Sequence, residues 1–304
     1  MARRALLIVN KLSRSGDADL SSAIGCLAAA GMEVLPFGIE DAGDIPKLIR
    51  AHRCRTDLVV LGGGDGTMNA ASEAILDVGV PMAILPLGTA NDLARTLGIP
   101  SDLEGACALA SSGIPHRIDL GRANDKHFFN VASIGLSVAV ANMIDAETKR
   151  RWGTAGYALT VWRALKEHRP FRARIRCDGR LLQTRSIQIA VGNGRHYGGG
   201  LTVAVDAAID DHQLDLYSIG PASMARLVLL APALRSGRQG EFQGVHLLRG
   251  QRIEIETRRP MPVNTDGEVT TQTPVDLRIL PGAVEVIVPQ AFVEASGEAD
   301  AAAE

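Results

Sequence analysis

The sequence lacks the long apolar runs that would identify a membrane-spanning or exported protein. At no point do about 18 uncharged apolar residues follow one another, which is what a membrane-spanning helix requires. The apolar run near the start covers only residues 5–9, which is too short for a signal peptide. We therefore expect a cytoplasmic protein that has no transmembrane segment and is at most peripheral to the inner surface of a membrane.

Two further absences narrow the class of protein. The net charge is −2 over 304 residues, so the chain as a whole offers no basic field, and we expect no nucleic-acid partner. The four cysteines are scattered and form no CxxC pair, which argues against both a zinc knuckle and a disulfide framework. Such cysteines are typical of small buried residues in a reducing compartment.

The first third of the chain alternates short apolar runs with helical stretches. Strands are expected at residues 5–9, 32–37, 57–61 and 81–85, and helices at 17–30, 43–52 and 68–78. This alternation predicts an α/β domain in which helices cover a parallel sheet.

The rest of the chain consists mainly of short β-rich segments separated by turn residues, which predicts an antiparallel sandwich or barrel. Helical insertions at about 144–168 and 222–235 interrupt this pattern. We place the two domains at residues 1–121 and 122–292. The small, acidic tail over 293–304 is expected to be disordered.

The junction LVVLGGGDGTMN (58–69) places glycines and one carboxylate between a strand and a helix. Glycine lets backbone N–H groups approach a phosphate, and the start of a helix adds partial positive charge. The P-loop motif GxxxxGK[ST] is missing and the GxGxxG spacing fails, so the usual phosphate-binding folds are not indicated. Asp65 would repel phosphate unless a cation lay between them, and Mg²⁺ prefers both kinds of oxygen. A tight turn that needs positive φ is the simpler alternative.

A second junction, PLGTANDLAR (86–95), also follows an apolar strand and opens a helical stretch. Together the two motifs resemble the catalytic domain that diacylglycerol kinases, sphingosine kinases and bacterial lipid kinases share. The first motif alone is less specific, because NAD kinases and phosphofructokinases carry related GGDG loops. The resemblance extends over nearly all of residues 5–289 through the stretches RIDLG, FFNVASIG, VGNGRHYGGG, AAIDDHQLDLY and NTDGEV.

This resemblance implies an ATP-binding α/β domain of the NAD-kinase and phosphofructokinase kind, a larger β-sandwich domain, and a cleft between them. The last strands of such proteins often return to the first domain. The implied reaction transfers the γ-phosphoryl group of ATP, with Mg²⁺, to the hydroxyl of a lipid presented at a membrane surface. A homodimer is left open.

The matched motif positions give the nucleotide contacts that the resemblance implies, which are Gly63, Gly64, Asp65, Gly66, Thr67, Met68, Asn69, Ala70 and Thr89. Backbone N–H groups and the Thr67 hydroxyl are assigned to phosphate, and Asp65 is assigned to Mg²⁺. Asn91 and Asp92 are expected to brace the second turn, because both residue types favour helix starts.

The TDGEV stretch supplies the candidate proton acceptors. A lipid hydroxyl must lose its proton as it attacks, and a carboxylate near the γ-phosphate can accept it. Similar proteins place this acid here, and we favour Glu268 as the catalytic base over Asp266. The alternative is an ordinary hairpin turn, since Asp-Gly between β-rich runs is a strong turn signal.

The stretch AAIDDHQLDLY resembles the family's structural metal loop. The implied Mg²⁺ ligands are the Asp211 carboxylate and the backbone carbonyls of Ala208 and Gln213, which suit a hard cation. The family usually has glycine where His212 stands, and histidine is a poor substitute if that position needs positive φ. The family also usually has glutamate where Ala70 stands and often has a threonine near residues 37–40, which read FGIE here.

Two other functions compete with the lipid kinase. The first is a NAD-kinase-like enzyme, whose glycine loop is similar but whose second motif differs from PLGTANDLAR. The second is a non-catalytic nucleotide- or lipid-binding protein of the same fold, which the departures at Ala70 and His212 favour.

Overall fold

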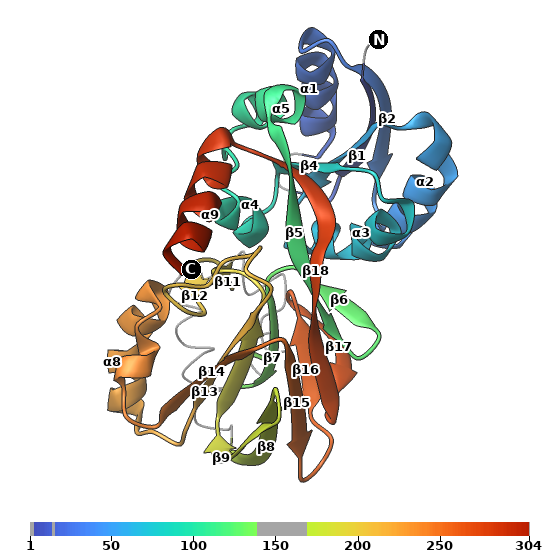
Figure 1. Cartoon of the computed structure of the whole chain (residues 1–304). Coiled ribbons are helices and arrows are strands. Elements are labelled where there is room, and N and C mark those ends of the chain that lie inside the picture. The colour runs from blue at the N-terminus through green and yellow to red at the C-terminus, as the bar shows by residue number, and fades with distance from the viewer. Residues whose placement is uncertain (1–2, 14–15, 139–168, 304) are drawn as a thin grey trace.

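The computed structural model describes residues 3–13, 16–138 and 169–303 (Figure 1). The expected helix at about 144–168 lies outside these residues. In the first part of the chain, strands and helices alternate in the order β1 (Arg4–Asn10), α1 (Gly16–Ala29), β2 (Glu33–Ile39), α2 (Ile45–His52), β3 (Leu58–Gly63), α3 (Asp65–Val78), β4 (Met82–Pro86), α4 (Asp92–Thr96) and α5 (Leu103–Ser112).

These first strands form a parallel sheet in the order β2-β1-β3-β4. Every residue of β3 and β4 is buried, which explains why their sequences are apolar runs rather than alternations. Helix α1 packs against α5, and α2 packs against α3, so that helices lie on both faces of the sheet (Figure 1). The predicted α/β arrangement is confirmed.

The second part of the chain is dominated by strands. Its elements are β5 (Ile114–Ala123), β6 (Lys126–Phe128), β7 (Val131–Gly135), β8 (Phe171–Cys177), β9 (Arg180–Ser186), β10 (Gln188–Gly192), β11 (His196–Tyr197), β12 (Leu201–Thr202), β13 (Leu214–Ile219), α8 (Met224–Ser236), β14 (Val245–Gly250), β15 (Arg252–Thr257), β16 (Pro262–Thr265), β17 (Glu268–Gln272), β18 (Val275–Val288) and α9 (Gln290–Ala303). Helix α8 confirms the helix expected at about 222–235.

Two antiparallel layers build the predicted sandwich. One contains β18, β15, β8 and β9, and the other has the order β14-β13-β10-β7-β16-β17. Alternate residues of facing strands, such as Ile255 of β15 and Leu216 of β13, share a buried apolar cluster. The intervening residues of the second layer, such as Tyr217, belong to another cluster together with Leu230 of α8.

Strand β18 connects the sandwich to the first sheet. It pairs with β15, runs antiparallel to β5, and ends beside β4, where Val286 pairs with Met82. The register against β5 shifts between Leu280 and Val284, and this irregularity lets one strand serve two cores. Residues before it pack in the sandwich, and residues after it pack in the α/β core. The last strand therefore returns to the first domain, as the resemblance implies.

The end of the chain differs from its prediction. The tail over 293–304 was expected to be disordered, but α9 extends through Ala303. Alanine and glutamate favour helix even where they cannot form a core. Phe292, at the start of α9, packs on the α/β core and meets the ring of His116 edge-on at 5.4 Å. The proposed boundary near residue 121 falls within β5, and division of the chain there stays a prediction.

Candidate active site

The first glycine loop joins β3 to α3 at the carboxyl edge of the parallel sheet. Helix α3 begins at Asp65, with Gly64 as its extended N-cap residue, so the free N–H groups of its first turn face out from the sheet edge. Thr67 is 4% exposed and lies directly over Gly63, where a Cβ atom would meet the Thr67 hydroxyl at 2.2 Å. This turn therefore needs glycine at residue 63 and presents backbone donors of the kind that bind phosphate.

The second loop joins β4 to α4 and touches the first. A Cβ atom on Gly88 would come within 2.4 Å of the Gly64 Cα atom, so only glycine permits this approach. Asn91 has a φ of 50°, and its side chain accepts from the Gly88 N–H and donates to the carbonyls of Pro86 and Gly88. These contacts support the expectation that Asn91 braces the turn. Thr89 is exposed at its tip.

Asp65 ties the two loops together. Its carboxylate oxygens accept the backbone N–H groups of Asp92 at 3.1 Å and Leu93 at 3.0 Å, at the start of α4. A negative charge at a helix start is favourable because the N-terminus carries partial positive charge. Asp65 therefore has a structural role that sequence reasoning did not assign.

Asp92 extends this connection to the glycine-rich loop at 191–200. Its carboxylate is buried, accepts the Gly199 N–H at 2.8 Å and pairs with Arg95. Burial raises the pKa of Asp92, and the Gly199 N–H opposes that rise. On the same loop, His196 contacts the Thr96 hydroxyl, and burial lowers the His196 pKa.

Asp266 lies in a hairpin turn between β16 and β17. Both Asp266 and Gly267 have positive φ, as the hairpin alternative predicts. The Asp266 side chain does more than form the turn, because its carboxylate accepts the N–H groups of Phe129 at 2.7 Å, Asn130 at 3.0 Å and Val131 at 2.9 Å. Burial nevertheless raises the pKa of Asp266 to about 7.

Asn130 connects the hairpin that carries Asp266, here called the acid hairpin, to the first glycine loop, and the sequence did not single it out. Its backbone N–H donates to Asp266, and its side-chain amide donates to Asp65 at 3.3 Å. The residue is 3% exposed, and its side-chain oxygen has no hydrogen-bond partner. The sequence feature that could have pointed to Asn130 is its position at the end of the FFN stretch, just before an apolar strand.

The remaining site residues predicted from the sequence differ in how exposed their side chains are. Gly66 and Glu268 are exposed, Met68 is buried, and Asn69 and Ala70 lie between these extremes. Glu268 begins β17 two residues beyond Asp266, so its side chain is free of the contacts that hold the Asp266 carboxylate. Glu268 is therefore the more accessible of the two acids.

A cavity of about 490 Å³ lies at the carboxyl ends of β1 and β2. Its lining includes Lys11, Lys47 and the segment from Phe37 to Glu40, the region where the resemblance leads one to expect a threonine. In the order β2-β1-β3-β4, all strands are parallel, and the order in which strands are added reverses between β1 and β3, next to this cavity. Ligands of open parallel sheets bind at such reversal points, outside the carboxyl ends of the strands.

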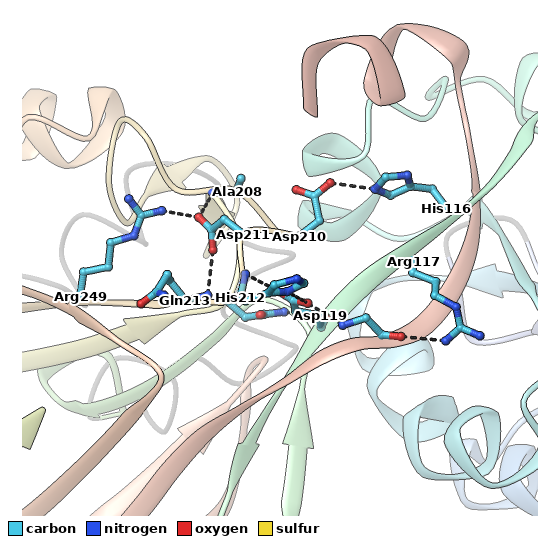
Figure 2. Close-up of polar contacts among 11 residues, drawn as sticks. His116, Arg117, Asp119, Ala208, Asp210, Asp211, His212, Gln213 and Arg249 are labelled. Atoms are coloured by element: carbon cyan, nitrogen blue, oxygen red, sulfur yellow. Dashed lines mark hydrogen bonds and ion pairs between the residues drawn. The ribbon is translucent and has the colours of Figure 1, made fainter. Parts of the chain in front are cut away.

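In the expected metal loop, groups of the protein itself contact the candidate ligand Asp211. The Asp211 carboxylate accepts the N–H groups of Ala208 and Gln213 and forms an ion pair with Arg249 (Figure 2). His212 has a φ of 61°, so this position does require the left-handed conformation. Among the described residues, no group of three or more His, Cys, Asp or Glu side chains is arranged to hold a metal ion.

Comparison with known proteins identifies the family. The model described as "Diacylglycerol kinase catalytic domain" matches residues 4–123, and "YegS C-terminal NAD kinase beta sandwich-like domain" matches residues 130–288. A probable lipid kinase YegS-like protein of Pseudomonas aeruginosa PAO1 is 32% identical over 293 residues, covering 95% of this chain and 96% of the relative. A diacylglycerol kinase of Bacillus subtilis is 28% identical over 269 residues, with 87% and 89% covered.

A solved structure agrees with the sequence matches. The crystal structure of a putative diacylglycerol kinase from Bacillus anthracis has a TM-score of 0.81, 29% identity, and coverage of 95% of this chain and 96% of the other. The fold and the paired glycine loops thus define a kinase. More narrowly, the chain belongs to the diacylglycerol kinase catalytic-domain family, which confirms the resemblance seen in its motifs.

Proposed function

We propose that the protein is an ATP-dependent lipid kinase that phosphorylates the hydroxyl of a diacylglycerol-like lipid. The observation that carries the proposal is the connection from the glycine loop through Asn130 to the acid hairpin. This connection brings an anion-binding helix start and the segment with the candidate base into one site. The relatives named as lipid and diacylglycerol kinases support the choice of acceptor.

In this proposal the polyphosphate lies across the start of α3. Backbone N–H groups of Gly64, Asp65 and Gly66 bind phosphate oxygens, because the Thr67 N–H already donates to the Gly64 carbonyl. Thr67, Met68, Asn69 and Ala70 follow in the helix, and Thr89 flanks from the second loop. The cavity beside Phe37 takes the nucleoside. The cavity lies at the carboxyl ends of β1 and β2, next to the point between β1 and β3 where the strand order reverses, and this supports the placement.

Magnesium fits the nucleotide site better than the loop at 208–213. Asp65 carries lone pairs beyond its contacts with two backbone N–H groups and the Asn130 amide, and the side-chain oxygen of Asn130 has no hydrogen-bond partner. These oxygens and the phosphate oxygens suit Mg²⁺. When bound there, the ion would neutralise charge on the transferred phosphoryl group.

Glu268 is proposed as the general base. As the lipid oxygen forms its bond to the γ-phosphorus, the hydroxyl proton passes to a Glu268 carboxylate oxygen, and the bond between the γ-phosphorus and the bridging oxygen breaks to release ADP. Asp266 holds residues 129–131 in place and thereby positions the hairpin. The lipid would reach this site from a membrane surface. Among the described residues, no helix is long and apolar enough to cross a membrane.

ATP turnover measured with separate acceptors tests this proposal against its alternatives. The acceptors are vesicles containing diacylglycerol, a sphingoid base or phosphatidylglycerol, and soluble NAD. Turnover that depends on one lipid supports the proposal. Turnover with NAD alone would indicate a NAD-kinase-like enzyme, and ATP binding without turnover would indicate a non-catalytic protein.

A further inference from the structure

The loop from Ala208 to Gln213 folds around an arginine. Asp211 turns back on its own segment, and its carboxylate accepts the Gln213 N–H at 2.9 Å and the Ala208 N–H at 3.1 Å. The Arg249 guanidinium reaches the same carboxylate from the neighbouring strand β14 (Figure 2). The acid that would ligate a cation is therefore satisfied by groups of the protein itself.

Arg249 also holds two more carboxylates. Its Nη1 atom faces Asp206 at 3.3 Å, its Nη2 atom contacts Asp211, and its Nε atom faces Asp215 at 3.6 Å. Asp215 lies directly opposite Arg249 in the pairing of β13 with β14, so the strand register sets this position. One guanidinium, with donors on three nitrogens, thus contacts three acids.

Two of these acids, Asp211 and Asp215, are largely buried, so their negative charge depends on the nearby guanidinium for stabilisation. The side chains of Asp211 and Asp215 are 18% and 11% exposed. Asp206 is 76% exposed and stays in solvent. Without a cation here, the carboxylates of Asp211 and Asp215 would lie near each other in a partly desolvated place.

The other side of the loop has a second protein anchor. His212 donates its backbone N–H to Asp119 at 2.7 Å, and its ring Nδ1 lies 2.9 Å from the other Asp119 oxygen. Asp119 is 1% exposed and also accepts the Gly282 N–H, so the loop is tied to β5 and β18 (Figure 2). These contacts hold His212 in the left-handed conformation, which glycine adopts more readily than histidine.

We propose that the Arg249 guanidinium takes the place of the divalent cation in the 208–213 loop, so that the folding of this loop does not require metal. This inference concerns a site apart from the proposed nucleotide site and does not depend on the identity of the lipid substrate. Its test therefore uses stability and metal content rather than activity.

The test compares the wild-type protein with Arg249→Gln in the absence of nucleotide. Metal content is measured by mass spectrometry after dialysis, and melting temperature is measured by circular dichroism with EDTA, Mg²⁺ or Ca²⁺. We expect wild type to contain far less than one equivalent of metal and to melt at the same temperature in all three conditions. Arg249→Gln should melt several degrees lower in EDTA and recover part of that loss with Ca²⁺ or Mg²⁺.

Two control variants make the test specific. Arg252→Gln removes a nearby arginine that pairs with Glu254 and Asp276, away from the loop, and should show no metal-dependent recovery. Adding Asp211→Asn to Arg249→Gln should abolish the recovery. The proposal is overturned if wild type carries one tightly held divalent ion and loses several degrees of melting temperature in EDTA. This wild-type measurement decides the question even if Arg249→Gln does not fold.

Discussion

The side-chain amide of Asn130 donates a hydrogen bond to the Asp65 carboxylate at 3.3 Å. Asp65 begins α3, the helix that we assign to phosphate binding. Asn130 lies just before β7 in the sandwich. The backbone N–H of Asn130 also binds Asp266 in the acid hairpin. A single residue thus links the elements that a phosphoryl transfer needs in one place.

Replacing Asn130 with Asp should lower kcat at least about tenfold, with a smaller effect on KM for the lipid. The change keeps the size of the side chain but removes the donor to Asp65 and adds a carboxylate between two others. Steady-state kinetics and a melting curve measure the effects on activity and folding. The matched control is Asn124→Asp, which makes the same change in the turn before β6, where the side chain donates to Thr271. Equal kinetic losses in both variants would contradict the role of Asn130.

Replacing Asp65 with Asn should both destabilise the protein and weaken nucleotide binding. The amide can accept through only one atom, so one N–H at the start of α4 loses its partner, at a cost of about 1–3 kcal/mol in the free energy of unfolding. Denaturant titration and ATP titration measure the two effects. Asp102→Asn is the control, because Asp102 accepts the Gly105 N–H at the start of α5, outside the site. Asparagine can still accept this single N–H, so Asp102→Asn should change stability little and leave nucleotide affinity unchanged. Unchanged affinity in Asp65→Asn would count against our assignment.

The raised pKa of Asp266 predicts how stability depends on pH. Its folded-state pKa is about 7, above the ordinary value of 3.8. Between these values the folded state keeps a proton that the unfolded state has lost, so stability contributed by this group falls as pH rises from about 4 to about 7. Three pKa units correspond to at most about 4 kcal/mol.

Denaturant titrations from pH 4.5 to pH 8 measure this dependence in wild type and in Asp266→Asn. The variant cannot titrate at residue 266, so its stability should fall less steeply across this window. It should also lose hydrogen bonds to residues 129–131, because the amide is a poorer acceptor. Parallel pH profiles for the two proteins would show that Asp266 keeps its ordinary pKa.

Glu268→Gln should reduce kcat by roughly 100-fold or more, because a positioned general base contributes about that much. Because Glu268 is exposed, the melting temperature of the variant should match that of wild type. The control is Glu256→Gln, which changes another exposed glutamate on β15, paired with Arg174. That variant should keep full activity, and full activity in Glu268→Gln would rule out this residue as the base.

The sequence predicted the glycine loops and the sheet well because local chemistry determines both. Buried parallel strands require apolar runs such as β3, and the close approach of Gly64 to Gly88 requires residues without a Cβ atom. The role of Asp65 was not predictable in the same way. It depends on α4 starting beside α3, which only the packing of the finished sheet determines.

Other features depended on contacts between distant segments. The sequence raised positive φ at residue 212 only as a condition, and the Asp119 contacts that hold His212 in that conformation were not predicted. The metal ligands at 208–213 were chosen from a motif, and the motif contains no information about Arg249 on a later strand. The helix α9 was missed because its composition was used to predict disorder, although Phe292 fixes its first turn to the core.

The most direct test of the account is transfer of label from [γ-³²P]ATP into organic-extractable lipid. Wild type and Glu268→Gln are compared on vesicles that contain diacylglycerol and on vesicles that lack it. We expect labelled product with wild type on the diacylglycerol vesicles only, and label near background with Glu268→Gln. Equal labelling by the two proteins, or label found in NAD and in none of the lipids, would contradict it.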